Sequence, residues 1–253
     1  MNFAWTPEQE AIREAILQVC KPFDAAYWLE RDRNGGFPLD FHKAIADAGW
    51  LGVCMPEAYG GSGLGIQEAA IMVQAISESG AGMSGVSAIH MNIFGLNPVV
   101  VFGTEEQKRR ILPPLISGKE KACFAVTEPN TGLNTTQLKT FAKKTADGYV
   151  VNGRKVWIST AQVTEKMLLL ARTTPLEEVK KPTDGLSLFY TNLDRRYVDV
   201  KEIEKLGRKA VDSNELFIDN LPIPQEDLIG EEGQGFRAIL HSMNPERALA
   251  AAG

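Results

Sequence analysis

The sequence predicts an α+β protein in which helices and strands are segregated along the chain. Three observations support this prediction. Apolar residues recur at helical spacing over the first 120 residues, short strand-like runs separated by turn sequences follow from residue 121, and helical spacing returns near Gly230. Elements grouped by type favour separate domains over an alternating parallel sheet. We therefore expect an N-terminal helical domain at 1–120, a β domain at 121–230 and a further helix within 231–253.

Capping residues mark the expected helices of the first region. Thr6 is the expected N-cap of a helix that has Pro7 at its first position and Gln9 in the capping-box position. Apolar residues at spacings of four, three and four then form one face of this helix: Ile12, Ile16, Val19 and Phe23. We expect further helices at 39–48, at 68–79 and at 105–116. Gly49 would end the helix at 39–48, and Thr104 would cap the start of the helix at 105–116.

Turn sequences divide the second region into short strands. Ala146-Asp147-Gly148 and Asn152-Gly153 are both typical of hairpin turns, and they separate strand-like runs at 140–145, 149–151 and 154–159. This arrangement predicts an antiparallel meander. Further strands are expected at 167–172, 186–192, 198–203 and 215–218, followed by a long helix at 236–252.

Charge and hydropathy exclude several classes of protein. Lys and Arg total 27 and Asp and Glu total 32, a formal charge of −5, which argues against a nucleic-acid binder. No uninterrupted apolar run is longer than that of Met167 to Ala171, well short of the ~20 residues of a membrane span, so we expect no membrane span. Glu8 and Glu10 precede the first basic residue, which is unlike a signal or transit peptide, and a cytoplasmic location is the expectation.

Cysteine and histidine spacing gives no sign of a metal site. The three cysteines, Cys20, Cys54 and Cys123, lie far apart and form no CxxC pair, and the three histidines form no HExxH motif. We therefore expect neither a disulfide framework nor a bound metal.

Two segments of the β region combine residues suited to ligand binding. A strand leads into Thr127-Glu128-Pro129 and then a turn rich in Asn, Thr and Gly, whose backbone N–H groups and hydroxyls would suit a planar heterocycle with phosphates. An ordinary strand-to-turn junction has the same pattern. The second segment, Trp157-Ile158-Ser159, places an aromatic ring beside a hydroxyl, a combination that is also common in protein cores.

The third segment, Asn244-Pro245-Glu246-Arg247, has two interpretations. As a helix start, Asn244 would be the N-cap, Pro245 would take the first position, and Glu246 would lie near the positive end of the helix dipole. That interpretation does not explain the small alanines that follow, which leave space beside the carboxylate. In the other interpretation Glu246 is a catalytic base.

Taken together and in order, eight segments resemble the acyl-CoA dehydrogenase family of flavoproteins, and the resemblance covers essentially the whole chain. The segments are MPEAYGGSGL ending at Leu64, FGTEEQK from Phe102, LPPLISG from Leu112, FAVTEPNTG from Phe124, VNGRKVWIS from Val151, KLG from Lys205, ELFIDNLPIP from Glu215 and LIGEEGQGF from Leu228. The resemblance implies an N-terminal helical domain, a middle antiparallel β-barrel and a C-terminal four-helix bundle. This chain would supply the first two and the start of the third, as a truncated member.

The resemblance also implies FAD as the cofactor and a set of residues that bind it. The first flavin-binding stretch matches Phe124, Val126, Thr127, Gly132 and Leu133, and the second matches Trp157, Ile158 and Ser159. Trp157 would lie near the flavin ring, and Ser159 would direct its hydroxyl towards the flavin N5. The family usually has Gly-Ser-Asp where this chain has Gly132-Leu133-Asn134, so Leu133 replaces a hydroxyl that commonly touches the flavin phosphate or the substrate.

For the catalytic base, Glu246-Arg247 resembles the pattern of isovaleryl-CoA and long-chain dehydrogenases, in which the base lies on the first helix after the barrel. The resemblance therefore implies that Glu246 is the base, with Leu133, Asn244, Pro245 and Arg247 near the substrate.

The expected function is FAD-dependent α,β-dehydrogenation of an acyl-CoA thioester in fatty acid or amino acid catabolism. An electron-transfer flavoprotein would accept the electrons, and the full-length protein would be a homotetramer. Two alternatives stay open: an acyl-CoA oxidase or flavin monooxygenase with the same fold, and a non-catalytic fragment that holds no flavin.

Overall fold

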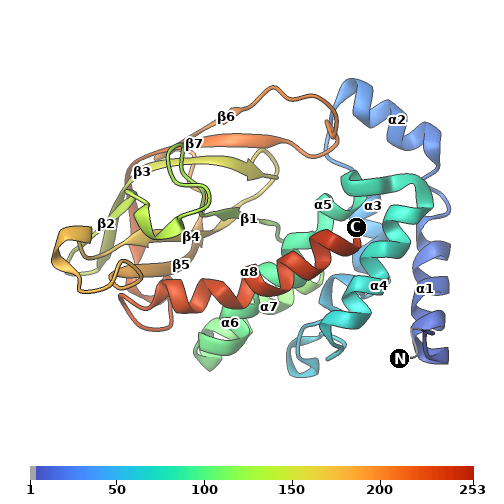
Figure 1. Cartoon of the computed structure of the whole chain (residues 1–253), viewed down its shortest axis with the longest axis horizontal. Helices are drawn as coiled ribbons and strands as arrows, with labels where there is room; N and C mark the ends of the chain where they lie inside the picture. Colours follow the sequence, from blue (N-terminus) through green and yellow to red (C-terminus); the bar gives the residue numbers. More distant parts are fainter. Residues whose placement is uncertain (1–3) are drawn as a thin grey trace.

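Helices form one side of the molecule and a twisted sheet forms the other (Figure 1). The computed structural model describes residues 4–253. The helices in chain order are α1 (Pro7–Cys20), α2 (Ala25–Asn34), α3 (Leu39–Asp47), α4 (Ile66–Ile76), α5 (Gly82–His90), α6 (Asn97–Phe102), α7 (Glu105–Ile116) and α8 (Gly235–Ala252). The α+β prediction of a helical region followed by a sheet region and a further helix is confirmed.

The capping residues act as the sequence predicts. Thr6 and Gln9 form a reciprocal capping box at α1, Thr104 and Gln107 form another at α7, and Gly49 takes a left-handed conformation just after α3. Helix α1 ends at Cys20, however, so Phe23 lies in the turn after the helix and packs into the core from there. Helix α2 was not predicted, because Trp28 is its one buried residue and its composition is polar.

One long helical stretch forms the centre of the helical side. Residues Ile66–Phe102 are long and apolar enough to cross a membrane, by length and composition only, and counting uninterrupted apolar residues does not detect them. In the folded protein, the most apolar 18-residue segment of this stretch is 72% buried. Two π-helical turns, Ser77–Ala81 and Met91–Gly95, interrupt the stretch, and Gly80 has a φ of +100°. These features fit a kinked core helix of a globular fold.

The strands form a single mixed sheet. They are β1 (Ala122–Ala125), β2 (Phe141–Lys144), β3 (Gly148–Ser159), β4 (Lys166–Arg172), β5 (Leu186–Asn192), β6 (Val198–Glu202), β7 (Ser213–Pro224) and β8 (Leu228–Ile229). Their order is β6-β7-β3-β2-β4-β5-β8, and β1 pairs with β4. Most pairs are antiparallel, but β1 and β2 both run parallel to β4, so the predicted meander is only partly correct.

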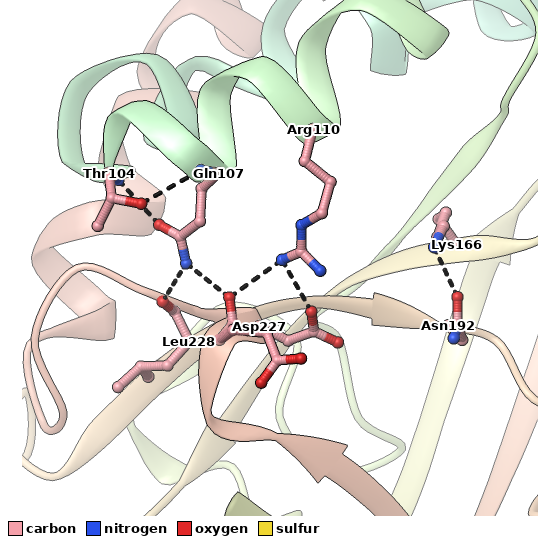
Figure 2. Close-up of polar contacts among 8 residues, drawn as sticks. Thr104, Gln107, Arg110, Lys166, Asn192, Asp227 and Leu228 are labelled. Atoms are coloured by element: carbon pink, nitrogen blue, oxygen red, sulfur yellow. Dashed lines mark hydrogen bonds and ion pairs between the residues drawn. The ribbon is translucent and has the colours of Figure 1, made fainter.

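The expected β-barrel is not closed. Within residues 4–253, the end strands of the sheet, β6 and β8, pair only with β7 and β5 respectively. Strand β8 has two residues, and helix α7 docks beside it. Gln107 Nε2 donates to the backbone oxygens of Glu226 and Leu228, both at 2.8 Å, and Arg110 pairs with Asp227 at 3.0 Å. Figure 2 shows Gln107 bonded to Leu228 and Arg110 bonded to Asp227. The helix therefore covers this end of the sheet, where barrel closure would need another strand.

The predicted hairpin at Asn152-Gly153 is also wrong. Strand β3 runs straight through these residues, and its register with β7 shifts by one residue between Val151 and Gly153. The sequence therefore marks a β-bulge. A Cβ atom at Gly153 would lie 2.3 Å from Thr140 Oγ1, so the glycine permits a close approach within the sheet rather than a chain reversal. The other predicted turn, 146–148, does join β2 to β3 as a hairpin.

Helix α8 returns from the sheet to the helical side, where it packs on α6 and α4 (Figure 1). Its residues Ile239 and Leu249 are buried, and its first residues pack on β5. Two hydrogen bonds fix it to the segment around α6: Ser242 Oγ donates to Gly95 O at 3.0 Å, and Asn97 Nδ2 donates to His241 O at 2.9 Å. A four-helix bundle is not formed by the described residues; α8 is the part of it that they contain. The division at 120 and 230 into three domains stays a prediction.

Candidate active site

A cavity of about 190 Å³ lies where the helices meet the sheet. Three parts of the chain far apart in sequence form its walls: β1 with the turn after it, the end of β3, and the helices α5 and α8 with the π-turn after α5. The lining residues are His90, Met91, Phe94, Phe124, Val126, Thr127, Gly132, Thr135, Trp157, Ser159, Thr160, Met243 and Glu246. Both apolar side chains and hydroxyls line this space, as in many sites for small ligands.

A second cavity of about 210 Å³ adjoins the first. The two share four lining residues, His90, Phe94, Ser159 and Glu246. The remaining walls of the second cavity come from α5, α8 and the loop before β7: Met83, Val86, Ser87, Arg208, Leu249 and Ala250. Glu246 therefore lies at the boundary between the two spaces.

Trp157 has an unusual position at the end of β3. The register between β3 and β7 shifts a second time between Lys155 and Ile158, and Trp157 has a φ of +61°. Its side chain is 60% exposed although it is a large aromatic. A left-handed conformation is strained for a bulky residue, and such strain is concentrated at functional sites. The bulge turns Trp157 to the cavity and sends the next residue, Ile158, into the core.

A buried ion pair fixes the Thr127-Glu128-Pro129 segment beneath the cavity. Lys155 Nζ donates to Glu128 Oε1 at 2.9 Å, to Val126 O at 3.0 Å and to Leu170 O at 2.7 Å, and its side chain is fully buried. Glu128 also accepts from the backbone N–H groups of Lys139 and Thr140, at 2.6 and 2.9 Å. Every Lys155 N–H is thereby used. The contacts hold the Val126 carbonyl in place, and with it the backbone that lines the cavity.

The electrostatics of this pair follow from its burial. Burial lowers the pKa of Lys155 to about 8, although the neighbouring Glu128 carboxylate acts in the opposite direction. Burial acts to raise the pKa of Glu128, but the Lys155 charge and the backbone donors outweigh it and bring that pKa below its usual value. The pair is therefore ionised near neutral pH.

Glu246 occupies the interior of α8, not its start. The helix begins at Gly235, so the prediction of Asn244 as N-cap and Pro245 at the first position is wrong: Pro245 lies inside the helix. Pro245 has no N–H to donate to His241 O four residues earlier, and Asn97 supplies that bond instead. The pattern Asn-Pro-Glu occurs at helix starts, but here tertiary contacts carry the helix through it.

The chemistry of Glu246 is set by burial. Burial raises the pKa of the Glu246 carboxyl, and the Arg247 charge opposes this only in part. Because Glu246 lies eleven residues after Gly235, the first residue of the helix, the dipole at the helix start does not act on it. Within residues 4–253 its carboxylate has no hydrogen-bond partner. A half-buried, unpaired carboxylate at a cavity is suited to accept a proton.

His90 is a cavity residue that the sequence did not single out. Its Nδ1 lies 2.8 Å from Ser87 O, a carbonyl that can only accept, so Nδ1 carries the proton. Burial lowers the pKa of His90, and the ring stacks on Phe94 at 5.2 Å. The ring is therefore neutral near pH 7. A single histidine in the apolar stretch 85–95 was the available signal, but it matches no metal or catalytic motif.

The cavity brings together most, but not all, of the residues expected to bind flavin or substrate. Phe124, Val126, Thr127, Gly132, Trp157, Ser159 and Glu246 line it. Five others do not: Leu133 is fully exposed, Ile158 is 1% exposed in the sheet core, and Asn244, Pro245 and Arg247 lie on α8 away from the cavity. Arg247 Nη1 bonds its own helix, at Met243 O and Asn244 Oδ1. Over the described part of the chain, no group of three His, Cys, Asp or Glu residues is placed to hold a metal.

Two family models match the chain in succession. Residues 6–119 match the acyl-CoA dehydrogenase N-terminal domain, and residues 123–221 match the middle domain of the same family. The chain belongs to the acyl-CoA dehydrogenase family. The middle-domain match contains both predicted flavin segments, whereas Glu246 lies beyond its last residue.

Relatives within the acyl-CoA dehydrogenase family agree with this assignment. The chain is 31% identical to the probable acyl-CoA dehydrogenase YngJ of Bacillus subtilis, over 100% of this chain and 66% of YngJ. It is 33% identical to the mitochondrial isobutyryl-CoA dehydrogenase of Dictyostelium discoideum, over 96% of this chain and 57% of that one. The chain thus spans less than two thirds of the length of these relatives.

Solved structures of the family have the same fold. An acyl-CoA dehydrogenase from Geobacillus kaustophilus superposes with a TM-score of 0.91 at 26% identity, over 100% of this chain and 66% of that chain. PigA in complex with FAD and proline superposes with a TM-score of 0.90 at 25% identity, over 100% and 65% of the two chains. The prolyl acyl carrier protein oxidase AnaB superposes with a TM-score of 0.89 at 28% identity, over 98% and 66%.

Proposed function

We propose that this protein is an FAD-dependent acyl-CoA dehydrogenase that introduces an α,β double bond into an acyl thioester. One observation carries the proposal. The unpaired carboxylate of Glu246 lines the same cavity as Thr127, Trp157 and Ser159. A base and a ligand site of the expected type therefore meet in one space, although Glu246 lies 87 residues or more from each of the other three in the chain.

The residues around the cavity fit a flavin. Trp157 offers an exposed indole beside it, Phe124 and Met91 supply apolar walls, and the hydroxyls of Thr127, Thr135 and Ser159 can bond the polar edge of a flat heterocycle. In this proposal Val126, Thr127, Trp157 and Ser159 hold the isoalloxazine ring. The cofactor, when bound, accepts the β-hydrogen of the substrate as hydride.

Glu246 performs the proton transfer in this proposal. Abstraction of an α-proton beside a thioester needs a carboxylate whose pKa is raised, because a stronger base shares the proton more favourably in the transition state. Burial raises the pKa of Glu246 in that direction. The second cavity, which begins at Glu246, would receive the acyl group and exclude water from the reacting carbons.

The experiment is a comparison of Glu246→Gln with the unaltered protein, both loaded with FAD. Gln keeps the shape and removes the proton acceptor. We expect bleaching of the flavin absorbance by saturated acyl-CoA thioesters, under anaerobic conditions, to slow by about 100-fold or more while flavin content is retained. The exposed Glu231→Gln, which removes the same charge elsewhere, is the matched control. Bleaching by Glu246→Gln within a few-fold of the unaltered protein would assign the base to another residue.

A second candidate function is oxidation with molecular oxygen as acceptor, which the likeness to the oxidase AnaB supports. The two differ in the fate of the reduced flavin. A dehydrogenase would reoxidise slowly in air and rapidly with an electron-transfer flavoprotein, the acceptor we propose, and an oxidase would do the reverse. Purification without any flavin would instead favour a non-catalytic role. Assembly as a homotetramer and a cytoplasmic location rest on the sequence and stay predictions.

A further inference from the structure

The loop before β7 projects a cation into the second cavity. Arg208 lines that cavity, and its backbone has a φ of +53°, directly after Gly207 at +70°. Two successive left-handed residues reverse the loop, so that Leu206 is fully exposed. Lys209 N donates to Asp32 Oδ1 on α2 at 3.3 Å, and the residues after it, Ala210 and Val211, are 1% and 0% exposed within the helical core. The strained conformation of Arg208 is therefore firmly supported.

Arg208 is free to bind a ligand. Among residues 4–253 its guanidinium has neither an ion pair nor a hydrogen bond, in contrast to Lys205, whose Nζ donates to Ser213 Oγ at 2.9 Å. The charge that acts on Glu246 comes from Arg247, whereas the Arg208 charge acts on His90. Arg208, His90 and Glu246 all line the second cavity, so a ligand held there would meet the guanidinium as well as the carboxylate.

The second cavity also contains a buried hydroxyl. Ser87 is 3% exposed and lines the cavity, and within the described chain its Oγ has no hydrogen-bond partner. The cavity also has apolar lining residues, among them Met83, Val86 and Leu249. A simple hydrocarbon chain would satisfy these residues but would leave both the hydroxyl and the cation without a partner.

We propose that Arg208, with Ser87, selects an acyl thioester whose distal end has an anionic group such as a carboxylate. The base Glu246 and the cation Arg208 line the same cavity, so one acyl group placed in it would contact both. The inference rests on the proposed function for the identity of the thioester. A bidentate guanidinium–carboxylate contact gives both attraction and orientation. The phosphates of coenzyme A are the other anions that Arg208 could meet, and the experiment separates the two.

The experiment compares matched thioesters on the FAD-loaded protein. Pentanoyl-CoA is paired with glutaryl-CoA and hexanoyl-CoA with adipoyl-CoA, so that each pair differs mainly in the terminal carboxylate. In at least one pair we expect the thioester with the terminal carboxylate to have a kcat/KM about tenfold higher than its partner's and a Kd about tenfold lower. Calorimetry measures the Kd. Arg208→Gln should remove most of that ratio. Lys209→Gln removes an adjacent exposed charge that does not line the cavity, and it should retain the ratio.

Three results would overturn the proposal. The first is a ratio near one between the two members of both pairs in the unaltered protein, and the second is a loss of the ratio in Lys209→Gln as large as in Arg208→Gln. The third is an equal weakening of both members of each pair by Arg208→Gln, which would indicate a phosphate contact. Arg208→Asn provides a second variant, because Asn tolerates the left-handed conformation. If no thioester bleaches the flavin, the proposed dehydrogenase function fails, and the calorimetric ratio still decides whether Arg208 binds the carboxylate.

Discussion

Lys155 Nζ lies 2.9 Å from Glu128 Oε1 in the interior of the sheet, with neither side chain more than 7% exposed. The pair links β3 to the turn after β1 and also holds the carbonyls of Val126 and Leu170. Its position directly behind the cavity makes it a support of the candidate site as well as of the fold.

Removal of one partner should destabilise the protein strongly. Lys155→Met leaves Glu128 charged, buried and without its cation, and we expect the free energy of unfolding to fall by about 3–5 kcal/mol. FAD loading should fall as well, because the Val126 carbonyl loses its donor. Chemical denaturation and flavin content measure the two effects. Lys144→Met, which breaks the exposed pair with Glu232, should change neither measurably; an equally small effect of Lys155→Met would contradict the assigned role.

Trp157 should matter for the cofactor and little for folding. Its side chain is 60% exposed, so Trp157→Ala removes few buried contacts, and Trp157→Gly also relieves the left-handed strain. We expect both variants to unfold at denaturant concentrations near that of the unaltered protein, with an FAD Kd raised by about tenfold. Released FAD fluorescence reports the Kd. Leu206→Ala, another exposed apolar side chain, is the control, and an unchanged FAD affinity in Trp157→Ala would remove Trp157 from the flavin site.

The raised pKa of Glu246 predicts opposite effects of pH on activity and stability. The base works when deprotonated, so the bleaching rate should fall as pH decreases through the raised pKa, above the usual carboxyl range. The folded state binds this proton more tightly than the unfolded chain. The stabilisation is thus complete below the unfolded value near 4.5 and is lost as pH rises through the folded pKa. Glu246→Gln should therefore be somewhat more stable than the unaltered protein at pH 7, as measured by thermal unfolding. A less stable variant would indicate that the carboxylate is favourably paired.

His42 should make the fold sensitive to acid. Burial, aided by the Lys121 charge, lowers the pKa of His42 to about 4, against 6.5 for an ordinary histidine, although Asn92 acts in the opposite direction. The unfolded chain therefore binds a proton first as pH falls. Stability is unaffected above pH 6.5 and decreases by up to about 3 kcal/mol as pH falls through 4. In His42→Gln this slope should flatten, and His241→Gln, in which a partly exposed histidine is removed, should keep it. Denaturation midpoints across pH 3.5–7.5 test the prediction.

Local signals in the sequence predicted those elements whose stability is local. The capping boxes at Thr6 and Thr104 and the glycine after α3 satisfy backbone groups within a few residues, so the pattern alone places the helix ends. Helix α5 and the π-turn after it have no capping residue in the sequence that would predict where they begin or end. Their geometry depends on glycines at 80 and 82 and on packing inside the core, which a sequence pattern does not report.

The errors at Asn152-Gly153 and at Asn244-Pro245 have the same origin. Each dipeptide favours a turn or a helix start by itself, but long-range contacts determine the result: Thr140 packs against Gly153, and Asn97 bonds the carbonyl that Pro245 leaves free. The candidate site was predicted only in part for a similar reason. Trp157 and Glu246 have family-type patterns, whereas His90 and Arg208 reach the cavities through a core helix and a strained loop.

The proline inside α8 has a consequence for how the molecule moves. A helix can slide along its neighbour by one turn, about 5.4 Å, when the contacts between them repeat. Here they do not repeat, because Pro245 leaves the carbonyl of His241 without a helix partner inside α8, and Asn97 supplies the donor instead. A slide in either direction would leave His241 O without a hydrogen-bond donor and would also move Glu246 away from both cavities. The missing N–H of Pro245, one residue before Glu246, therefore fixes the position of α8 along its neighbours.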